Sequence, residues 1–438
     1  MTSDVRHGLS RVAMVSLHTS PLERPGMGDA GGLNVYVAET ATRLARRGVE
    51  VDVFTRAVLD TQPSALQLAP GVTVHHLVAG PTAPLPKGDL PRHLTAFATQ
   101  LAAHLDVAGG YDVVHSHYWL SGIAALHARA AQTSRAGLVH TMHTMARVKN
   151  LALAPGEARE PALREEGEER VVAAADALVA NTDLEARQLI DLYAAAPQLV
   201  QVVHPGVALE TFRPGPQDAA RRAVGLPSDA LVLLFVGRIQ PLKAPDVLVR
   251  AAGELLRRAP GLRDRLVVAI LGGLSGAGLD RPGSLQEVVA EEGLQEVVRF
   301  GPRVSRAELA DWYRAADLLA VPSHNESFGL VAIEALACGT PVVAAKVGGL
   351  PVAVGEAGVL VDGHDPATWA EALGDALTRL SEPGGRAAWS DQAVAHAQHF
   401  SWERTIDRLL EVYAFAADHS RHQGQVAAPD VTCATVTS

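Results

Sequence analysis

Two spacings of apolar residues alternate along the chain. Short apolar runs such as RVAMVSLH, at residues 11–18, are typical of buried strands. A Gly-rich loop and the amphipathic segment NVYVAETATRLARRG follow, Gly48 ends that predicted helix, and VEVDVFT begins the next strand. Because this strand–helix order repeats, we expect an α/β fold with parallel sheets covered by helices on both faces.

The pattern breaks once, in the Pro- and Gly-rich stretch PGVALETFRPG, and restarts with LVLLFVGR. We therefore expect two Rossmann-like, doubly wound parallel-sheet domains, at residues 11–204 and 217–400, facing an interdomain cleft. Residues 205–216 would be the linker, and a helix at 401–418 would cross back to the first domain. Residues 1–10 and 419–438 are expected to be disordered.

Composition narrows the class of protein. The 438 residues carry 38 Lys and Arg against 48 Asp and Glu, a net charge of −10, which argues against general nucleic-acid binding. The two cysteines, Cys338 and Cys433, provide neither a disulfide framework nor a CxxC metal site. No apolar run reaches the roughly 18 residues of a membrane span, and no signal peptide is evident, so we expect a soluble cytoplasmic protein. An anionic ligand would need local positive charge.

Ligands of open α/β sheets bind beyond the carboxyl ends of the strands, so we weigh the polar residues found there. Gly31 and Gly32 precede the first predicted helix, where free backbone amides suit a phosphate, although a flexible loop is the alternative. The spacing GMGDAGG is not a dinucleotide fingerprint. Arg238 and Lys243 follow the first strand of the second domain; they could neutralise a departing diphosphate or be solvated surface residues.

Two carboxylates stand in PSHNESFGLVAIEALACGTPVVA, where a helix is expected to begin near Ser327. Glu326 and Glu334 are eight residues apart, which on a helix separates them by about 12 Å and leaves them within about 80° of one direction. Both could contact one elongated ligand, one at sugar hydroxyls and the other at a ribose. The alternative, an exposed helical Glu334, agrees poorly with its apolar surroundings.

Four histidines lie at two predicted strand ends: His115, His117, His140 and His143. An HxH pair on one strand face could bind a metal, which keeps a metallohydrolase as an alternative. No carboxylate at ligand spacing accompanies them. The neighbouring Tyr and Thr residues suit a sugar pocket better.

Five segments together carry a family resemblance: GMGDAGGLNVY, HSHYWLSG, HTMHTMARVKN, VGRIQPLKAPD and NESFGLVAIEALACGTPVVA. The chain resembles retaining GT-B glycosyltransferases of the glycogen-synthase and sucrose-synthase superfamily over residues 11–417. Within it, the likeness is greatest to the inositol-phosphate branch. The resemblance implies transfer of N-acetylglucosamine from UDP-GlcNAc to 1D-myo-inositol 3-phosphate with retention, the first step of mycothiol biosynthesis.

The resemblance also implies site residues. His143 would orient the donor sugar, while Arg238, Lys243 and Glu326 would act at the reacting centre. The implied donor site comprises Arg24, Pro25, Gly32, Arg238, Lys243, Arg303, Glu326 and Glu334. The implied acceptor site comprises His18, Asp29, Ala30, Gly31, Gly32, Leu33, Asn34, Lys87, Tyr118, Thr144 and Arg164. Arg164 lies in REPALREEGEER, which could equally be a solvated helix face.

No cofactor is implied for the chemistry, because Arg and Lys stabilise the leaving group. A structural Mg²⁺ is implied near Tyr313, Arg314, Ala316 and Thr340, and a homodimer is expected. Two alternatives within the superfamily are a sucrose-phosphate-forming or mannosyl transferase. A nucleotide-sugar epimerase would need acid–base carboxylates in place of an acceptor pocket, and a noncatalytic binding module could lose Arg238, Lys243 or Glu326.

Overall fold

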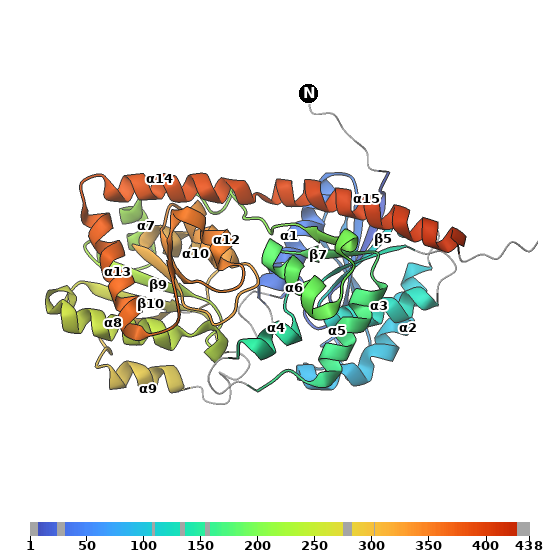
Figure 1. Ribbon diagram of the computed structural model, residues 1–438, viewed down its shortest axis with the longest axis horizontal. Helices are drawn as coiled ribbons and strands as arrows, with labels where there is room; N and C mark the ends of the chain where they lie inside the picture. The colour runs from blue at the N-terminus through green and yellow to red at the C-terminus, as the bar shows by residue number, and fades with distance from the viewer. Residues whose placement is uncertain are drawn as a thin grey trace, which may run out of the picture.

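Two α/β domains lie side by side, joined by a long C-terminal helix (Figure 1). The computed structural model describes residues 8–23, 31–106, 110–131, 136–153, 158–274, 283–301 and 303–426. Within these ranges, none of the helices combines the length and apolarity that crossing a bilayer requires. The predicted pair of doubly wound, Rossmann-like parallel-sheet domains is confirmed.

The first domain contains an eight-stranded sheet in the order β3-β4-β2-β1-β5-β6-β7-β8. Its strands are β1 (Arg11–Val15), β2 (Glu50–Arg56), β3 (Ala65–Ala69), β4 (Val72–Leu77), β5 (Val113–His117), β6 (Gly137–Thr141), β7 (Ala177–Ala180) and β8 (Val200–Val202). All neighbours pair in parallel except β3, an antiparallel edge strand. The helices are α1 (Gly32–Arg46), α2 (Leu94–Leu105), α3 (Trp119–Ala130), α4 (Ala146–Leu151), α5 (Ala162–Ala174) and α6 (Asp183–Tyr193), with a short 3-10 helix, η1 (Lys87–His93).

The second domain contains a six-stranded parallel sheet in the order β11-β10-β9-β12-β13-β14. Its strands are β9 (Leu231–Val236), β10 (Leu266–Leu271), β11 (Val298–Gly301), β12 (Leu318–Val321), β13 (Val342–Ala345) and β14 (Val359–Val361). Its helices are α7 (Gln217–Ala223), α8 (Pro245–Arg258), α9 (Ser284–Glu291), α10 (Arg306–Ala315), α11 (Leu330–Ala337), α12 (Leu350–Val354), α13 (Pro366–Ser381) and α14 (Gly385–Ala397). Both faces of this sheet are buried, and this explains why its strands have unbroken apolar runs in the sequence.

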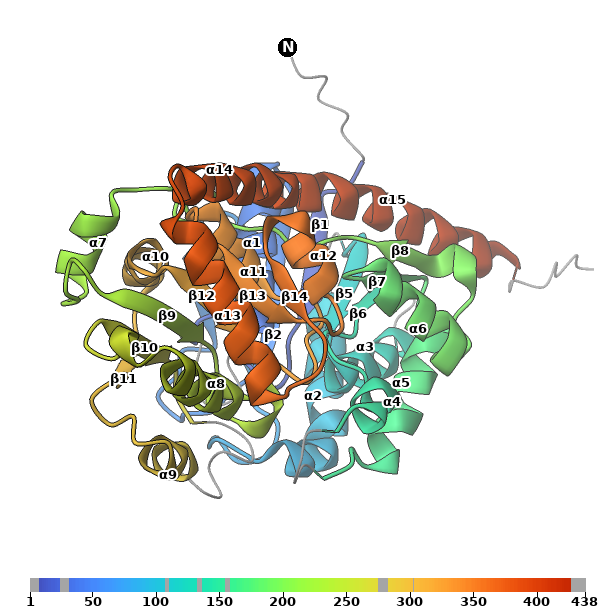
Figure 2. The ribbon, with the colours of Figure 1, turned by 60° about the vertical axis from the view of Figure 1, so that its left-hand side comes forward.

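The last helix, α15 (Trp402–Val426), ties the domains together, and Figure 2 shows it passing over the first domain. Trp402 is buried in the core of the second domain, whereas Leu409 and Tyr413 are buried against the first sheet. The expected tail from residue 419 is wrong at its start, because the helix continues to Val426. Ser420 is buried beside Ala136, so packing extends the helix beyond the point where its apolar pattern fades.

Candidate active site

The reversal of strand order in each sheet locates the site. In the first sheet the order reverses between β1 and β5, and in the second between β9 and β12. Ligands of such sheets bind beyond the carboxyl ends of the strands at this switch point. His18 follows β1, Tyr118 follows β5, Arg238 follows β9 and Glu326 follows β12. The predicted site residues of both domains therefore lie just after strand ends at the switch points, and these two sets of strand ends face each other.

A cavity of about 790 Å³ lies between the domains and is lined from both sides. Gly31 and Arg238 come from opposite domains, and a Cβ built on Gly31 would lie 3.9 Å from Nε of Arg238. The cationic lining residues are Lys87, Lys149, Arg238, Lys243, Arg303 and Arg306. The carboxylates in the lining are Glu185, Glu308, Glu326 and Glu334. In a chain with a net charge of −10, this is a local excess of positive charge, as an anionic ligand requires.

Lys243 and Glu326 form an ion pair in the cavity wall of the second domain. Lys243 ends the turn before α8, and Ala244 adopts a left-handed conformation with φ 48°. The carbonyl of Glu326 accepts a hydrogen bond of 2.8 Å from Gly349 N–H. Gly348 has φ 52°, and a Cβ there would lie 2.0 Å from that carbonyl, so only glycine allows this approach. The backbone thus fixes both members of the pair.

Glu334 also lines the cavity, although it does not share a helix with Glu326. The expected helix start near Ser327 is wrong, since α11 begins at Leu330 after a left-handed Gly329. The distance expected along one continuous helix therefore does not apply. The Tyr313 hydroxyl donates a 3.0 Å hydrogen bond to Glu334. Burial raises the pKa of Glu334 to about 7, while Arg306 and the Tyr313 hydrogen bond oppose that shift.

His18, Lys87 and Tyr118 gather on the first-domain side of the cavity. The rings of His18 and Tyr118 are 4.6 Å apart, and Nζ of Lys87 lies 5.7 Å from the Tyr118 ring centroid. Burial lowers the pKa of His18 well below its ordinary value, and the positive charges of Lys87, Arg164 and Arg238 lower it further. The resemblance implies a donor-site role for Arg238 and an acceptor-site role for Lys87 and Arg164, and the charges of all three act on one neutral imidazole.

Arg164 and Asn34 support the cavity from behind and are not among the residues found to line it. Arg164 is buried; its guanidinium binds Glu168 at 2.7 Å and donates to the Thr144 hydroxyl at 3.0 Å. Asn34 accepts a 2.9 Å hydrogen bond from Gly31 N–H and donates to Ser20 O at 2.6 Å. In this structure both residues position neighbours that do line the cavity, Thr144 and Gly31.

Strained backbone marks the same region. Tyr118 and His143 are non-glycine residues with φ of 71° and 58°, and both line the cavity. A positive φ of this kind costs a non-glycine residue on the order of 1–3 kcal/mol, and such strain gathers at functional sites. Burial lowers the pKa of His143 to about 3, so its imidazole is neutral near pH 7.

Two family models match the chain: "Glycosyltransferase Family 4" over residues 30–211 and "Glycosyl transferases group 1" over residues 216–393. The D-inositol 3-phosphate glycosyltransferase of Saccharomonospora viridis is 57% identical over 409 residues, covering 92% of this chain and 93% of that protein. The same-named enzyme of Actinosynnema mirum is 57% identical, covering 95% and 99%. The chain belongs to the D-inositol 3-phosphate glycosyltransferase family.

Solved structures agree with this placement. Sucrose-phosphate synthase from Thermosynechococcus elongatus has a TM-score of 0.80 at 29% identity, covering 95% of this chain and 99% of that one. Anabaena HepE in complex with UDP and glucose has a TM-score of 0.69 at 20% identity, covering 92% and 98%, and supports the fold alone. The predicted GT-B fold and the predicted hexosyltransferase activity are thus confirmed.

Most predicted site residues of this glycosyltransferase that lie in described ranges meet at one cavity. Those lining it are His18, Gly31, Gly32, Leu33, Lys87, Tyr118, His143, Thr144, Arg238, Lys243, Arg303, Glu326 and Glu334. Arg24, Pro25, Asp29 and Ala30 lie outside the described residues.

Sequence reasoning missed several lining residues of the glycosyltransferase, among them Tyr36, Asn181 and Glu185. Glu185 stands three residues after Thr182, the N-cap of α6, a spacing that by itself suggests a capping role. Its carboxylate does accept the Asn181 N–H at 2.8 Å, but Oε1 is buried and has no partner in the described ranges. Burial raises the pKa of Glu185 to about 7, a signal that only the tertiary structure provides.

The four histidines of the glycosyltransferase form a buried cluster that does not resemble a metal centre. His115 is bound to the Tyr413 hydroxyl at 2.7 Å and to the Thr141 hydroxyl at 2.8 Å. Ring nitrogens of His117 and His143 are 3.0 Å apart. Within the described residues, no group of three or more His, Cys, Asp or Glu is arranged to hold a metal ion. A metallohydrolase is therefore not favoured.

The four residues expected at a structural Mg²⁺, Tyr313, Arg314, Ala316 and Thr340, are hydrogen-bonded to other groups of the protein. The Tyr313 carbonyl already accepts the Thr340 hydroxyl at 2.6 Å, and the Ala316 carbonyl accepts the Gln217 amide at 3.1 Å. The Arg314 guanidinium is bound to Asp311 at 2.7 Å. Mg²⁺ prefers six oxygen ligands in octahedral geometry, usually including a carboxylate, and none of the four predicted residues has a carboxylate side chain.

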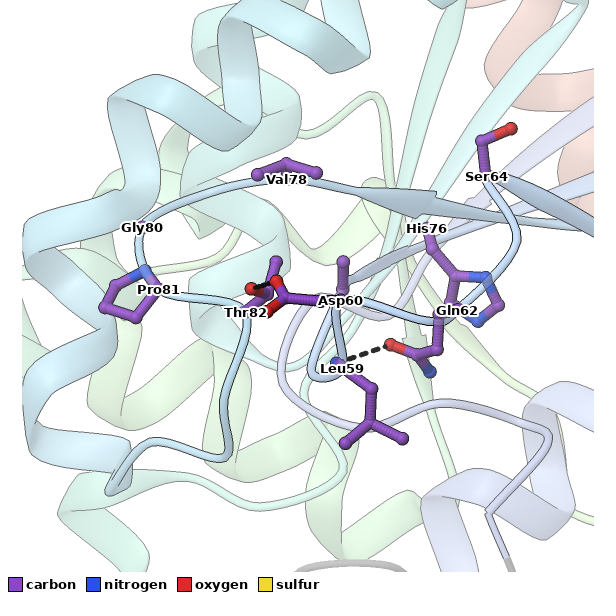
Figure 3. Close-up of a pocket in the computed structure, with 10 residues that line it drawn as sticks. Leu59, Asp60, Gln62, Ser64, His76, Val78, Gly80, Pro81 and Thr82 are labelled. Carbon is purple, nitrogen blue, oxygen red and sulfur yellow. Dashed lines mark hydrogen bonds between the residues drawn. The ribbon is translucent and has the colours of Figure 1, made fainter.

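A second hollow of about 420 Å³ lies on the first domain, beyond the ends of β2 and β4 (Figure 3). Thr82 donates a hydrogen bond to Asp60 across it, and Gln62 accepts one from Leu59 N–H at 3.0 Å. No Lys or Arg is among the described residues that line it. The hollow therefore lacks the positive charge that a sugar diphosphate requires.

Proposed function

We propose that this enzyme transfers N-acetylglucosamine from UDP-GlcNAc to 1D-myo-inositol 3-phosphate with retention of anomeric configuration. The products would be 1D-myo-inositol 2-acetamido-2-deoxy-α-D-glucopyranoside 3-phosphate and UDP, which places the enzyme at the first step of mycothiol biosynthesis. The observation that carries the proposal is the cavity in which cations of both domains face each other. Such a site suits two anionic substrates that react with one another.

On the donor side, Arg238 and Lys243 would bind the diphosphate. The backbone amide of Gly32, at the start of α1, would bind it too. The acceptor hydroxyl oxygen bonds to the anomeric carbon while the bond from that carbon to the β-phosphate oxygen breaks. The departing phosphate oxygen takes the hydroxyl proton on the same face of the sugar. The two cations stabilise charge that grows on the phosphate only as the bond breaks, which lowers the barrier and not merely the ground state.

On the acceptor side, Lys87 and the Thr144 hydroxyl would hold the inositol phosphate, with Tyr118 beside them. Arg164 would contribute charge from behind, through its contact with Thr144 and its position 4.8 Å from the Tyr118 ring centroid. The phosphate carries nearly two negative charges near neutral pH, and charge-assisted hydrogen bonds are the strong ones.

A substrate panel tests the proposal directly. Purified enzyme is incubated with UDP-GlcNAc, UDP-glucose or GDP-mannose, each with inositol 3-phosphate or fructose 6-phosphate, and nucleotide release is measured. We expect release only with UDP-GlcNAc and inositol 3-phosphate together, and an α-linked product by NMR. Release with fructose 6-phosphate would favour the sucrose-phosphate-forming alternative.

A matched pair of variants tests the acceptor site. Lys87→Ala should raise KM for inositol 3-phosphate by on the order of 10-fold or more, through loss of a charged hydrogen bond, and leave UDP binding unchanged. Arg92→Ala is the control, because Arg92 lies on the same short helix with an exposed side chain. Equal KM values for the two variants would place the acceptor elsewhere.

The cytoplasmic location, the homodimer and the bound Mg²⁺ stay predictions. Light scattering and metal analysis of the purified enzyme test the last two.

A further inference from the structure

His143 reaches the cavity from a strained backbone and is held by one other histidine. Its φ is 58°, and its Nε2 lies 3.0 Å from Nδ1 of His117. The Tyr36 ring packs edge-on against both imidazoles, with centroids 5.2 Å from His143 and 5.7 Å from His117. Because Nε2 of His143 is hydrogen-bonded to His117, Nδ1 is the ring nitrogen left for a ligand.

His117 is fully buried at the end of β5 and does not line the cavity in the described part of the chain. Its ring centroid lies 4.1 Å from that of His115, whose two nitrogens are already bound to hydroxyls. Nε2 of His117 is buried with no hydrogen-bond partner in the described residues. Within the described ranges, the contact with His143 is thus the one side-chain hydrogen bond of this imidazole.

The protonation of the pair follows from burial. Burial lowers the pKa of both imidazoles, that of His117 well below its ordinary value, so each ring is neutral and carries one hydrogen. If His143 donated from Nε2, the hydrogen of His117 would sit on Nε2, as a buried N–H without a partner. Buried N–H groups without partners are rare in proteins. If His117 donates from Nδ1 instead, its Nε2 carries no hydrogen and every N–H of the pair can be used.

We propose that His117 is a positioning residue: it donates its Nδ1 hydrogen to Nε2 of His143 and so presents the Nδ1–H of His143 to an oxygen of the donor sugar. His117 acts through His143 and touches no substrate. This inference rests on the proposed function, because the donor sugar is the ligand that His143 is expected to orient. It adds which nitrogen of His143 carries the hydrogen, and what sets that choice.

Three substitutions separate this role from simple packing. His117→Asn keeps an amide nitrogen near the place of Nδ1, His117→Gln moves its amide toward the place of Nε2, and His117→Leu removes the hydrogen bond. With UDP-GlcNAc and inositol 3-phosphate, we expect kcat to fall on the order of 10-fold or more in the Gln and Leu variants, as for other residues that orient a ligating histidine. The Asn variant should recover most of that loss. KM for the acceptor and the affinity for UDP should stay within about twofold, since neither ligand meets His117.

A second readout does not depend on turnover. Ring ¹⁵N shifts of the full chain, with the His143 signals assigned by their loss in a His143→Asn variant, report which nitrogen carries the hydrogen. We expect the Nδ1–H form of His143 in the wild type and in His117→Asn, and a mixture of tautomers in His117→Gln. Circular dichroism establishes that each variant is folded, and an unfolded Leu variant leaves the Asn and Gln comparison to decide.

An Nε2–H His143 in the wild type would overturn the proposal, as would equal kcat values for the Asn and Gln variants. Failure of the proposed function is distinguishable from both, because it would appear as absence of UDP release in the wild type while the His143 tautomer stayed as expected.

Discussion

Lys243→Ala is the substitution that tests the proposed chemistry most directly. The ammonium group lines the cavity beside Glu326 and is held there by the left-handed turn at Ala244. A full unit of charge developing about 4 Å from a cation interacts with it by ~4 kcal/mol at an effective dielectric constant of 20. Removing one preorganised stabiliser of this kind costs about 10²–10³ in kcat, or roughly 2.7–4 kcal/mol. We expect a loss in that range.

The assay must separate loss of the cation from exposure of its partner. Lys243→Ala leaves the Glu326 carboxylate without its ion pair, and that charge alone could repel a diphosphate. We therefore compare Lys243→Ala, Glu326→Gln and the double variant, with kcat from UDP release at saturating substrates and UDP affinity from calorimetry. Lys346→Ala is the matched control, since Lys346 is half-exposed and pairs with Asp362. It is not one of the described residues that line the cavity.

Two results would contradict this role of Lys243. If Lys243→Ala kept kcat within about fivefold of the wild type, less than ~1 kcal/mol of barrier lowering could be assigned to this cation. If the double variant recovered wild-type kcat, the loss would come from the unpaired carboxylate and not from the missing positive charge. An equal loss in Lys346→Ala would point to a general effect of net charge.

Two stability predictions follow from burial and packing. Burial raises the pKa of Glu334 to about 7, so the folded chain keeps a proton that the unfolded chain, with an ordinary pKa of 4.5, releases; stability therefore falls as pH rises from 4.5 to 7, by ~3 kcal/mol for this group. Glu334→Gln should raise Tm relative to the wild type at pH 8 and not at pH 5 in thermal melts, and an equal shift at both pH values would contradict the assignment. Gly206→Ala should lower the free energy of unfolding by about 1–3 kcal/mol, because a Cβ there would meet the backbone nitrogen of Trp402 at 2.4 Å. Gly261→Ala, where a Cβ meets nothing within 4 Å, is the control in the same denaturant titration.

The sheets were predictable because their strands are buried on both faces and have unbroken apolar runs, as in β1 and β9. The antiparallel edge strand β3 gave no such signal, since three of its five residues are exposed. Arg238 and Lys243 could be placed because they follow a strand, and a strand end is a position that sequence defines. Glu185 could not be recognised, because its spacing from Thr182 already has a local explanation in helix capping. What makes it unusual is burial between elements distant in sequence.

The pairing of the cavity's cations shows why a site residue is more than its position in a motif. Lys243 is paired with Glu326, Arg306 of the second domain with Glu39 of the first, and Lys149 with Glu160. Each of these three cations is thus oriented by a carboxylate before any ligand arrives, which reduces the rotamer entropy that binding would otherwise cost. A diphosphate gains only the difference between its own attraction and that of the carboxylate. This arrangement favours a ligand whose charge grows during the reaction, because the advantage over the resident carboxylate is greatest in the transition state.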